Sequence, residues 1–127
     1  MKKYLVIGNP IEHSLSPKLH NHWIKENNID AVYDKKQLNE TDIKRIISEV
    51  KDGKIDGINV TIPFKKSVIP FLDKLTPLAN ETHSVNTIYK ENKNGVDVVV
   101  GDNTDVGGFK QSLEYIHYNI KNKKIFI

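Results

Sequence analysis

Short β-type apolar runs alternate with amphipathic helical patterns along this chain, and that alternation restricts its fold more than any other feature. The run Tyr4-Leu5-Val6-Ile7 stops at Gly8-Asn9-Pro10, as a buried strand followed by a turn does. The apolar residues between 43 and 50 instead follow the i, i+3, i+4, i+7 spacing of a helix with one buried face. Strands that alternate with helices predict an α/β layer structure with a mainly parallel sheet.

The other elements follow from the same patterns. Strands are predicted at residues 3–8, 31–38, 55–61, 85–90 and 96–100. Helices are predicted from Ser16 to about residue 27, at 39–53, at 64–72 with an interruption at Pro70, at 76–81, and from Asp105 onward. Asn94-Gly95 between the last two strands is typical of a β-hairpin turn, so the sheet is mixed. We expect a three-layer α/β/α domain in which helices flank this mainly parallel sheet.

For three of the predicted helices, the sequence also predicts which side chains cap the helix or form its apolar face. Ser16 is the expected N-cap of the first helix, with Leu19 and Trp23 as its buried stripe. The segment 64–72 is expected to turn Val68, Phe71 and Leu72 inward. The last helix places a set of apolar residues on one face, namely Val106, Phe109, Leu113 and Ile116.

Composition excludes several classes of function. The chain has no cysteine, which excludes disulfides, thiolate zinc sites and cysteine nucleophiles. The formal net charge is +3 and Arg45 is the only arginine, which disfavours a nucleic-acid surface. No apolar run approaches the roughly 20 residues that cross a bilayer. We therefore expect a cytoplasmic protein that interacts with neither nucleic acid nor a membrane.

The length and the last residues predict the domain organisation. A chain of 127 residues has the size of one domain, which we assign to residues 1–120. Residues 121–127 begin as a polar, lysine-rich connector and end in the apolar β-type run Ile125-Phe126-Ile127. Because strands average about 5 to 6 residues, this run is expected to be the start of the first strand of a following unit. A naturally frayed terminus is the alternative.

Polar residues gather where predicted strands end, which is where ligands bind in α/β sheets. Ser14 and Ser16 precede the first helix, where their hydroxyls either cap the helix and the loop or meet a carboxylate ligand. Asn59 and Thr61 share one face of a strand and can address one pocket. Lys65 stands at a predicted helix start, where positive charge opposes the helix dipole. Either solvent screens this ammonium group or it faces a carboxylate or a substrate.

Two further segments allow both structural and functional interpretations. Asn86 enters the hairpin, where it serves as a turn residue or as a bidentate partner for a diol. The segment 101–109 has polar residues before Gly107-Gly108 and a helix, as an Asp or Thr N-cap with closely packed glycines does. It lacks the G-x-G-x-x-G and Gly-Lys-Ser/Thr patterns of phosphate loops.

Together these motifs resemble those of the shikimate dehydrogenase family. The matching residues are Gly8, Pro10, Ser14, Ser16, Asn59-Val60-Thr61-x-Pro63-x-Lys65, Asn86-Thr87 and Gly101-x-Asn103-Thr104-Asp105-x-x-Gly108-Phe109. Their order and spacing agree across nearly the whole chain. The resemblance implies an amino-terminal substrate-binding domain, with NADP held by a carboxy-terminal Rossmann domain that is absent from these residues.

The resemblance also implies roles for individual residues. Ser14, Ser16 and Thr61 would hold the shikimate carboxylate or a neighbouring hydroxyl, and Asn86 and Asp105 would bind ring hydroxyls. Lys65 and Asp105 would be the catalytic pair in the reduction of 3-dehydroshikimate to shikimate with NADPH, a step of aromatic amino acid biosynthesis. We expect protonated Lys65 to donate a proton to the developing alkoxide. His83-Ser84 replace the Gly-Ala that usually precedes the family's asparagine.

The expected cofactor, partners and alternatives follow from this resemblance. No residue of the chain is expected to bind NADP or a metal, so these residues alone should be inactive. The expected partners are shikimate and 3-dehydroshikimate, and a homodimer is left open. Two alternatives also stay open: a quinate/shikimate dehydrogenase of broader specificity, and a non-catalytic small-molecule binding module.

Overall fold

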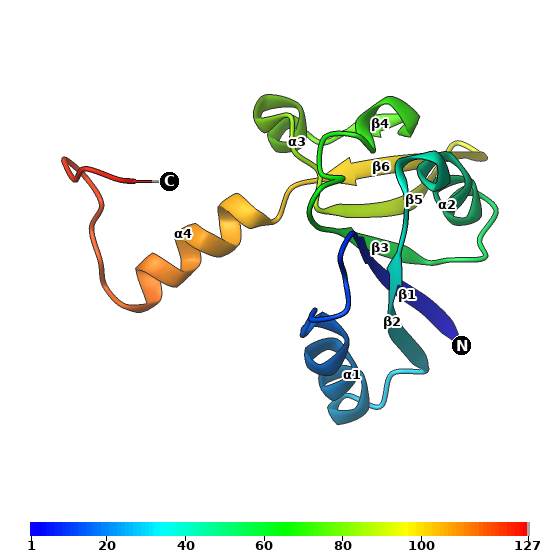
Figure 1. Cartoon of the computed structure of the whole chain (residues 1–127), viewed down its shortest axis with the longest axis horizontal. Helices are drawn as coiled ribbons and strands as arrows, with labels where there is room; N and C mark the ends of the chain where they lie inside the picture. The colour runs from blue at the N-terminus through cyan, green and yellow to red at the C-terminus, as the bar shows by residue number, and fades with distance from the viewer. Residues whose placement is uncertain (127) are drawn as a thin grey trace.

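The computed structural model of the chain describes residues 1–126 and contains one six-stranded sheet with helices around it (Figure 1). The strands are β1 (Lys2–Gly8), β2 (Ala31–Gln37), β3 (Gly57–Val60), β4 (Lys74–Leu75), β5 (Thr87–Lys93) and β6 (Val96–Asp102). The α-helices are α1 (Ser16–Glu26), α2 (Ile43–Lys51), α3 (Pro77–Thr82) and α4 (Asp105–Tyr115), and short 3-10 helices span Glu40–Asp42 and Ile69–Phe71. No helix in the described part of the chain is long and apolar enough to cross a bilayer.

The strand order β2-β1-β3-β5-β6-β4 confirms the predicted mixed α/β sheet. β1 pairs in parallel with both β2 and β3, and β4 pairs in parallel with β6. β5 runs antiparallel to β3 and to β6, so the hairpin is the antiparallel part of the sheet. At its turn Asn94 and Gly95 have φ angles of 53° and 81°, as the expected two-residue hairpin turn requires. The two-residue strand β4 was not predicted.

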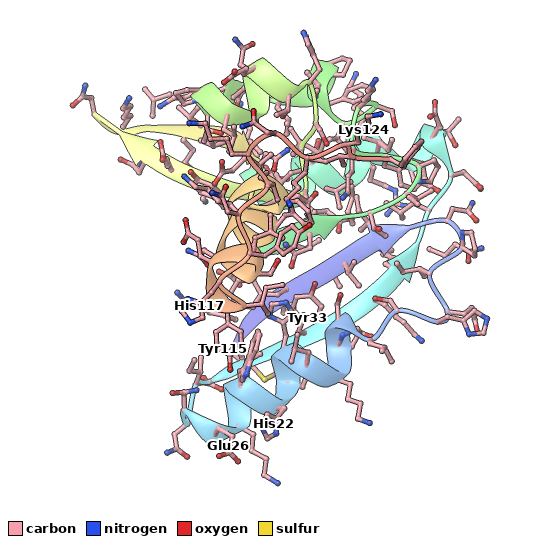
Figure 2. The ribbon with its side chains drawn as sticks, turned by 90° about the vertical axis from the view of Figure 1, so that its left-hand side faces the viewer. His22, Glu26, Tyr33, Tyr115, His117 and Lys124 are labelled. Carbon is pink, nitrogen blue, oxygen red and sulfur yellow. The ribbon has the colours of Figure 1, made fainter. Side chains whose placement is uncertain are left out.

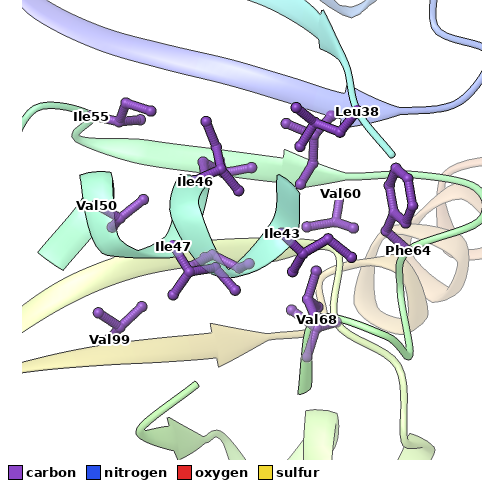
Figure 3. Packing of buried hydrophobic residues seen from close by; sticks show 14 of the residues in the cluster. Leu38, Ile43, Ile46, Ile47, Val50, Ile55, Val60, Phe64, Val68 and Val99 are labelled. Carbon is purple, nitrogen blue, oxygen red and sulfur yellow. The ribbon is translucent and has the colours of Figure 1, made fainter. Parts of the chain in front are cut away.

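Helices cover both faces of the sheet. Successive side chains of β1 point to opposite faces, so neighbouring residues of this strand belong to different apolar clusters. Ile7 belongs to the main core, together with Ile43, Ile46, Ile47 and Val50 of α2. Figure 3 shows these α2 side chains directed toward the strands. Val6 instead packs with Tyr33 and with Ile24 of α1 in a second, smaller cluster. The layers are therefore α1, sheet and α2, as predicted.

The segment 39–53 behaves as the sequence predicts. Asp42 Oδ2 accepts a hydrogen bond from the Asn39 N–H at 2.9 Å, which fixes the start of the helical segment. The four predicted apolar residues of α2 are all buried. Gly53 ends the segment with a φ angle of 77°, which glycine adopts without strain.

Two predictions about α1 were wrong. The helix begins at Ser16, so Leu15 is the N-cap, and Ser14 Oγ accepts a hydrogen bond from the Ser16 N–H at 3.3 Å. Leu19 and Trp23 are 48% and 49% exposed instead of buried. The reason is that α1 meets the sheet through a different face, which carries His20, Asn21 and Ile24.

The segment 64–72 is also less regular than predicted. It forms turns and the 3-10 helix Ile69–Phe71 instead of an α-helix, because Pro70 cannot donate the backbone hydrogen bond that a helix interior requires. Val68 is buried and Leu72 packs against the core, as expected, but Phe71 is exposed.

Helix α4 forms where predicted and projects away from the sheet (Figure 1). Val106 and Phe109 on its apolar face are exposed, and Ile116 just beyond its end is exposed too. No side chain of the described residues lies within 4 Å of a Cβ atom placed on Gly107 or Gly108, so the expected close packing of these glycines is absent there. Residues 125–126 are not in a strand, and Ile127, the last residue of the predicted strand start, lies outside the described residues. The proposed boundary at residue 120 stays a prediction.

Helix α3 confirms its predicted cap, because Thr76 Oγ1 accepts a hydrogen bond from the Ala79 N–H at 3.3 Å. At the other end of α3, His83 adopts the left-handed conformation with a φ angle of 50°. This conformation favours glycine over residues with a Cβ atom. It supplies a backbone reason for the glycine that the resemblance implies at position 83.

Replacing His83 with Gly should therefore stabilise the chain. The left-handed conformation costs an L-residue about 1 kcal/mol, so H83G should raise the free energy of unfolding by up to that amount. Urea denaturation checks this. The matched control is Ser84→Gly at the next position, where φ is not positive, and that change should lower stability. A decrease of the unfolding free energy in H83G would contradict this explanation.

Candidate active site

One cavity of about 330 Å³ brings together five of the six predicted site residues. These residues come from α1, the turn after β3, the position just before β5 and the start of α4, and they are Ser16, Thr61, Lys65, Asn86 and Asp105. Because β1 and β3 are parallel neighbours, their carboxyl ends lie at this same edge of the sheet. Residues far apart in the sequence thus face a common space.

The remaining predicted residue, Ser14, lines an adjoining cavity of about 340 Å³ together with Pro10 and His13. Ser16 and Thr61 line both cavities, so the two spaces meet at these side chains. The approach of the two loops depends on Gly8, because a Cβ atom there would lie 2.6 Å from Thr61 Cγ2.

An ion pair between Lys65 and Asp105 lies in the cavity of about 330 Å³. Lys65 Nζ donates to Asp105 Oδ2 at 2.6 Å, and the two side chains are 34% and 50% exposed. Asp105 is the first residue of α4, where the helix dipole favours a negative charge. The cavity therefore offers a ligand a cationic donor and an anionic acceptor side by side. The sequence had left open whether Lys65 is screened by solvent or faces a carboxylate, and here it faces one.

Asn103 holds the loop that carries Asp105, a role that the sequence reasoning missed. Its buried side chain accepts hydrogen bonds from the N–H groups of Asp105 and Val106 at 2.9 and 3.2 Å, so it caps α4. It also donates to Thr82 Oγ1 and to the Ser84 carbonyl, both at 3.1 Å. The sequence had offered Asp or Thr as this cap, and the asparagine between them is the residue that caps.

Asn86 connects the hairpin to the same loop. Its Nδ2 donates to Thr104 Oγ1 at 2.8 Å, and its Oδ1 accepts from the Thr104 N–H at 2.9 Å. The predicted diol-binding residue is therefore also a structural clamp between β5 and the start of α4.

His20 lines the cavity, and Tyr33 contacts two of its lining residues, His20 and Asn59; neither Tyr33 nor His20 was singled out from the sequence. The Tyr33 hydroxyl donates to Asn59 Oδ1 at 2.8 Å, and the His20 ring stacks on Tyr33 with a centroid distance of 4.2 Å. Figure 2 shows Tyr33 next to α1. Burial raises the pKa of the Tyr33 hydroxyl to about 12, against a smaller opposing effect of Ser16, and burial lowers the pKa of His20. Tyr33 is thus a neutral donor and His20 is biased toward the neutral form.

The chain should lose stability on acidification. Burial lowers the pKa of His20, and hydrogen bonds from the N–H groups of Asn39 and Val99 lower the pKa values of Asp42 and Asp73. A group with a lowered pKa binds fewer protons in the folded than in the unfolded chain, so the free energy of unfolding falls as the pH falls. The loss begins below the ordinary pKa of 6.5 for His20 and continues below 3.8 for the two carboxyls.

Urea denaturation at pH 7.5, 5.0 and 3.5 measures this loss. Asp73→Asn is the informative variant, since it removes one of the titrating carboxyls and should flatten the dependence between pH 5.0 and 3.5. Equal or greater stability at pH 3.5 than at pH 7.5 would contradict the assignment.

Residues 6–88 match the family described as the shikimate dehydrogenase substrate binding domain. This chain belongs to the shikimate dehydrogenase family. It is 53% identical over 126 residues to the shikimate dehydrogenase (NADP(+)) of Pelagibacter ubique, covering 99% of this chain and 46% of that relative. The corresponding enzyme of Aquifex aeolicus is 40% identical over 124 residues, covering 98% of this chain and 45% of that relative.

Solved shikimate dehydrogenase structures have the same fold as this chain. The Listeria monocytogenes enzyme in complex with shikimate and NAD has a TM-score of 0.84 and 31% identity, covering 94% of this chain and 40% of that one. The Thermus thermophilus enzyme in complex with shikimate has a TM-score of 0.85 and 28% identity, covering 96% of this chain and 45% of that one. The chain thus spans less than half the length of the shikimate dehydrogenases it matches.

Proposed function

We propose that the cavity around Lys65 and Asp105 is the shikimate site of a dehydrogenase that reduces 3-dehydroshikimate to shikimate. The observation that carries this proposal is the Lys65–Asp105 ion pair of 2.6 Å in a cavity that is also lined by Ser16, Thr61 and Asn86. The complexes of the Listeria and Thermus relatives with shikimate support the choice of ligand. Assembly as a homodimer stays a separate prediction.

The residues that line the two cavities are assigned to opposite ends of the ligand. Ser16 and Thr61 line both cavities, and Ser14 lines the adjoining one. We assign these three residues to the carboxylate or a neighbouring hydroxyl. The start of α1 lies at the same place, and the positive end of its helix dipole favours an anion there. We assign Asn86 and Asp105 to the ring hydroxyls at the other end.

Lys65 is assigned the proton transfer. Reduction of a ring ketone converts its carbonyl oxygen into an alkoxide, which needs a proton and gains from a nearby positive charge. The Lys65 ammonium group supplies both, and its pairing with Asp105 holds it at the cavity. In the reverse direction the amine recovers the proton from the alcohol, and Asp105 keeps the hydroxyl oriented.

The relatives are named for NADP(+), but the residues of this chain do not fit that cofactor. The sequence has no G-x-G-x-x-G segment. Its adjacent glycines, Gly107 and Gly108, lie inside α4, where the Gly108 N–H already donates to the Thr104 carbonyl at 3.0 Å. A pyrophosphate cradle needs free N–H groups at a helix start. We propose that residues 1–127 bind shikimate without binding NADP and turn over no substrate by themselves.

Calorimetric titration of shikimate into the chain tests the proposal. We expect saturable binding of one shikimate, weaker binding of quinate, and no heat from NADP. Lys65→Met should weaken the shikimate signal, and Lys66→Met, at the exposed neighbouring lysine, is the matched control that should not. No binding of shikimate by the folded chain would contradict the proposal, and equal binding of quinate would favour the broader dehydrogenase.

A further inference from the structure

The side chain of Asn59 has almost all of its hydrogen-bonding capacity in use. Its Oδ1 accepts from the Tyr33 hydroxyl at 2.8 Å, while Nδ2 donates to the Asn86 carbonyl at 3.2 Å and to Thr87 Oγ1 at 3.3 Å. An amide has two N–H donors and two acceptor lone pairs. Asn59, which lines the cavity, therefore has one acceptor site left for a ligand.

The side chain of Asn86 has a free donor instead of a free acceptor. Its Oδ1 accepts from the Thr104 N–H at 2.9 Å and from the Thr87 hydroxyl at 3.1 Å, which uses both lone pairs. Its Nδ2 donates once, to Thr104 Oγ1 at 2.8 Å, and so keeps one free N–H. Within the described hydrogen bonds, the two asparagines thus offer a ligand one acceptor and one donor.

Asn59 offers its acceptor to a ligand only if its amide group is held in this orientation. The bond from Tyr33 is the shortest of its three, and the other two are near the upper limit for hydrogen bonds. Tyr33 itself is fixed, because it is buried, its ring stacks on His20, and its backbone is bound on both sides by Asn21. It is not among the residues that line the cavity.

We propose that Tyr33 is a positioning residue that locks the Asn59 amide, so that the cavity selects ligands with a hydroxyl that donates to Asn59 and accepts from Asn86. This inference rests on the proposed function and deepens it, since it names the ligand hydroxyl that Asn59 and Asn86 recognise. Tyr33 acts through Asn59 and does not touch the ligand.

Tyr33→Phe tests the inference, because it removes the hydroxyl and keeps the ring that packs on His20. The affinity for shikimate, measured by calorimetry, should fall about three- to tenfold, as expected for one neutral hydrogen bond. The affinity for cyclohex-1-ene-1-carboxylate, which has the ring and the carboxylate but no hydroxyls, should fall much less when followed by NMR. Tyr4→Phe, at the other tyrosine of the same apolar cluster, is the matched control and should change neither.

A second readout follows the lock itself without any ligand. The side-chain NH₂ signals of Asn59 in a ¹⁵N spectrum should move and broaden in Tyr33→Phe but not in Tyr4→Phe. Unchanged Asn59 signals, unchanged shikimate affinity, or an equal loss of affinity for both acids would each overturn the inference. If the unsubstituted chain fails to bind shikimate, the proposed function fails, and the Asn59 signals still decide whether Tyr33 holds the amide.

Discussion

Replacing Lys65 with Met should lower kcat by about 10²- to 10⁴-fold, the usual contribution of a positioned acid or base. The enzyme for this measurement joins residues 1–127 to the remaining length of the Pelagibacter ubique relative, which is 53% identical over the shared part. Methionine has an unbranched side chain one atom shorter than that of lysine, and it cannot donate a proton or stabilise an alkoxide with a positive charge. Because the other residues assigned to the carboxylate and to the ring hydroxyls stay in place, KM should change only a few-fold.

Lys66→Met is the control for this experiment, since it removes an adjacent exposed lysine and should leave kcat unchanged. Asp105→Asn is the companion variant. It keeps the shape of the side chain but removes the charge that pairs with Lys65 at 2.6 Å, so it should also lower kcat. A kcat for Lys65→Met close to that of the unsubstituted enzyme would reject Lys65 as the proton donor.

Asn103→Ala should destabilise the chain by about 2 kcal/mol or more, because it removes a helix cap and leaves buried partners without hydrogen bonds. The Asn103 side chain makes hydrogen bonds with the N–H groups of Asp105 and Val106, with Thr82 and with the Ser84 carbonyl. The same change frees the start of α4, so Asp105 should no longer be held beside Lys65. Urea denaturation measures the first effect and shikimate titration the second.

Asn103→Asp separates the two functions of this residue. The carboxylate still accepts from the N–H groups of Asp105 and Val106, but it cannot donate to the Ser84 carbonyl. Its stability should therefore lie between those of the unsubstituted chain and Asn103→Ala. If Asn103→Ala were as stable as the unsubstituted chain, the cap would have no importance for the loop.

Sequence patterns predicted the elements whose conformation and buried face follow from the residues within the element itself. Helix α2 has a complete apolar stripe, so the buried side chains could be named from spacing alone. The hairpin follows from Asn94-Gly95, because this pair adopts positive φ angles easily. Helix α1 shows the limit of this reasoning. Its most apolar face, with Leu19 and Trp23, points outward, and only the tertiary structure reveals that the sheet contacts His20 and Asn21 instead.

Some residues of the site could likewise be predicted from the sequence, and others could not. Lys65 could be predicted as a site residue because a lysine at an expected helix start opposes the helix dipole, and the family resemblance implied Asp105 as its partner. The hydrogen bond from Tyr33 to Asn59 joins residues 26 positions apart, and the bond from Asn103 to Thr82 joins residues 21 apart. No local spacing rule predicts such pairs, since they depend on how strands and loops are arranged in space.

We propose that residues from α1, the turn after β3, the segment before the hairpin and the start of α4 form a single shikimate site. Titration of the ¹⁵N-labelled chain with shikimate, followed by two-dimensional NMR, decides whether they do. We expect the backbone amide signals of Ser16, Thr61, Lys65, Asn86 and Asp105 to move together and to saturate at one common ligand concentration. Signals that stay fixed at Lys65 and Asp105 while others on a different surface move would contradict the claim.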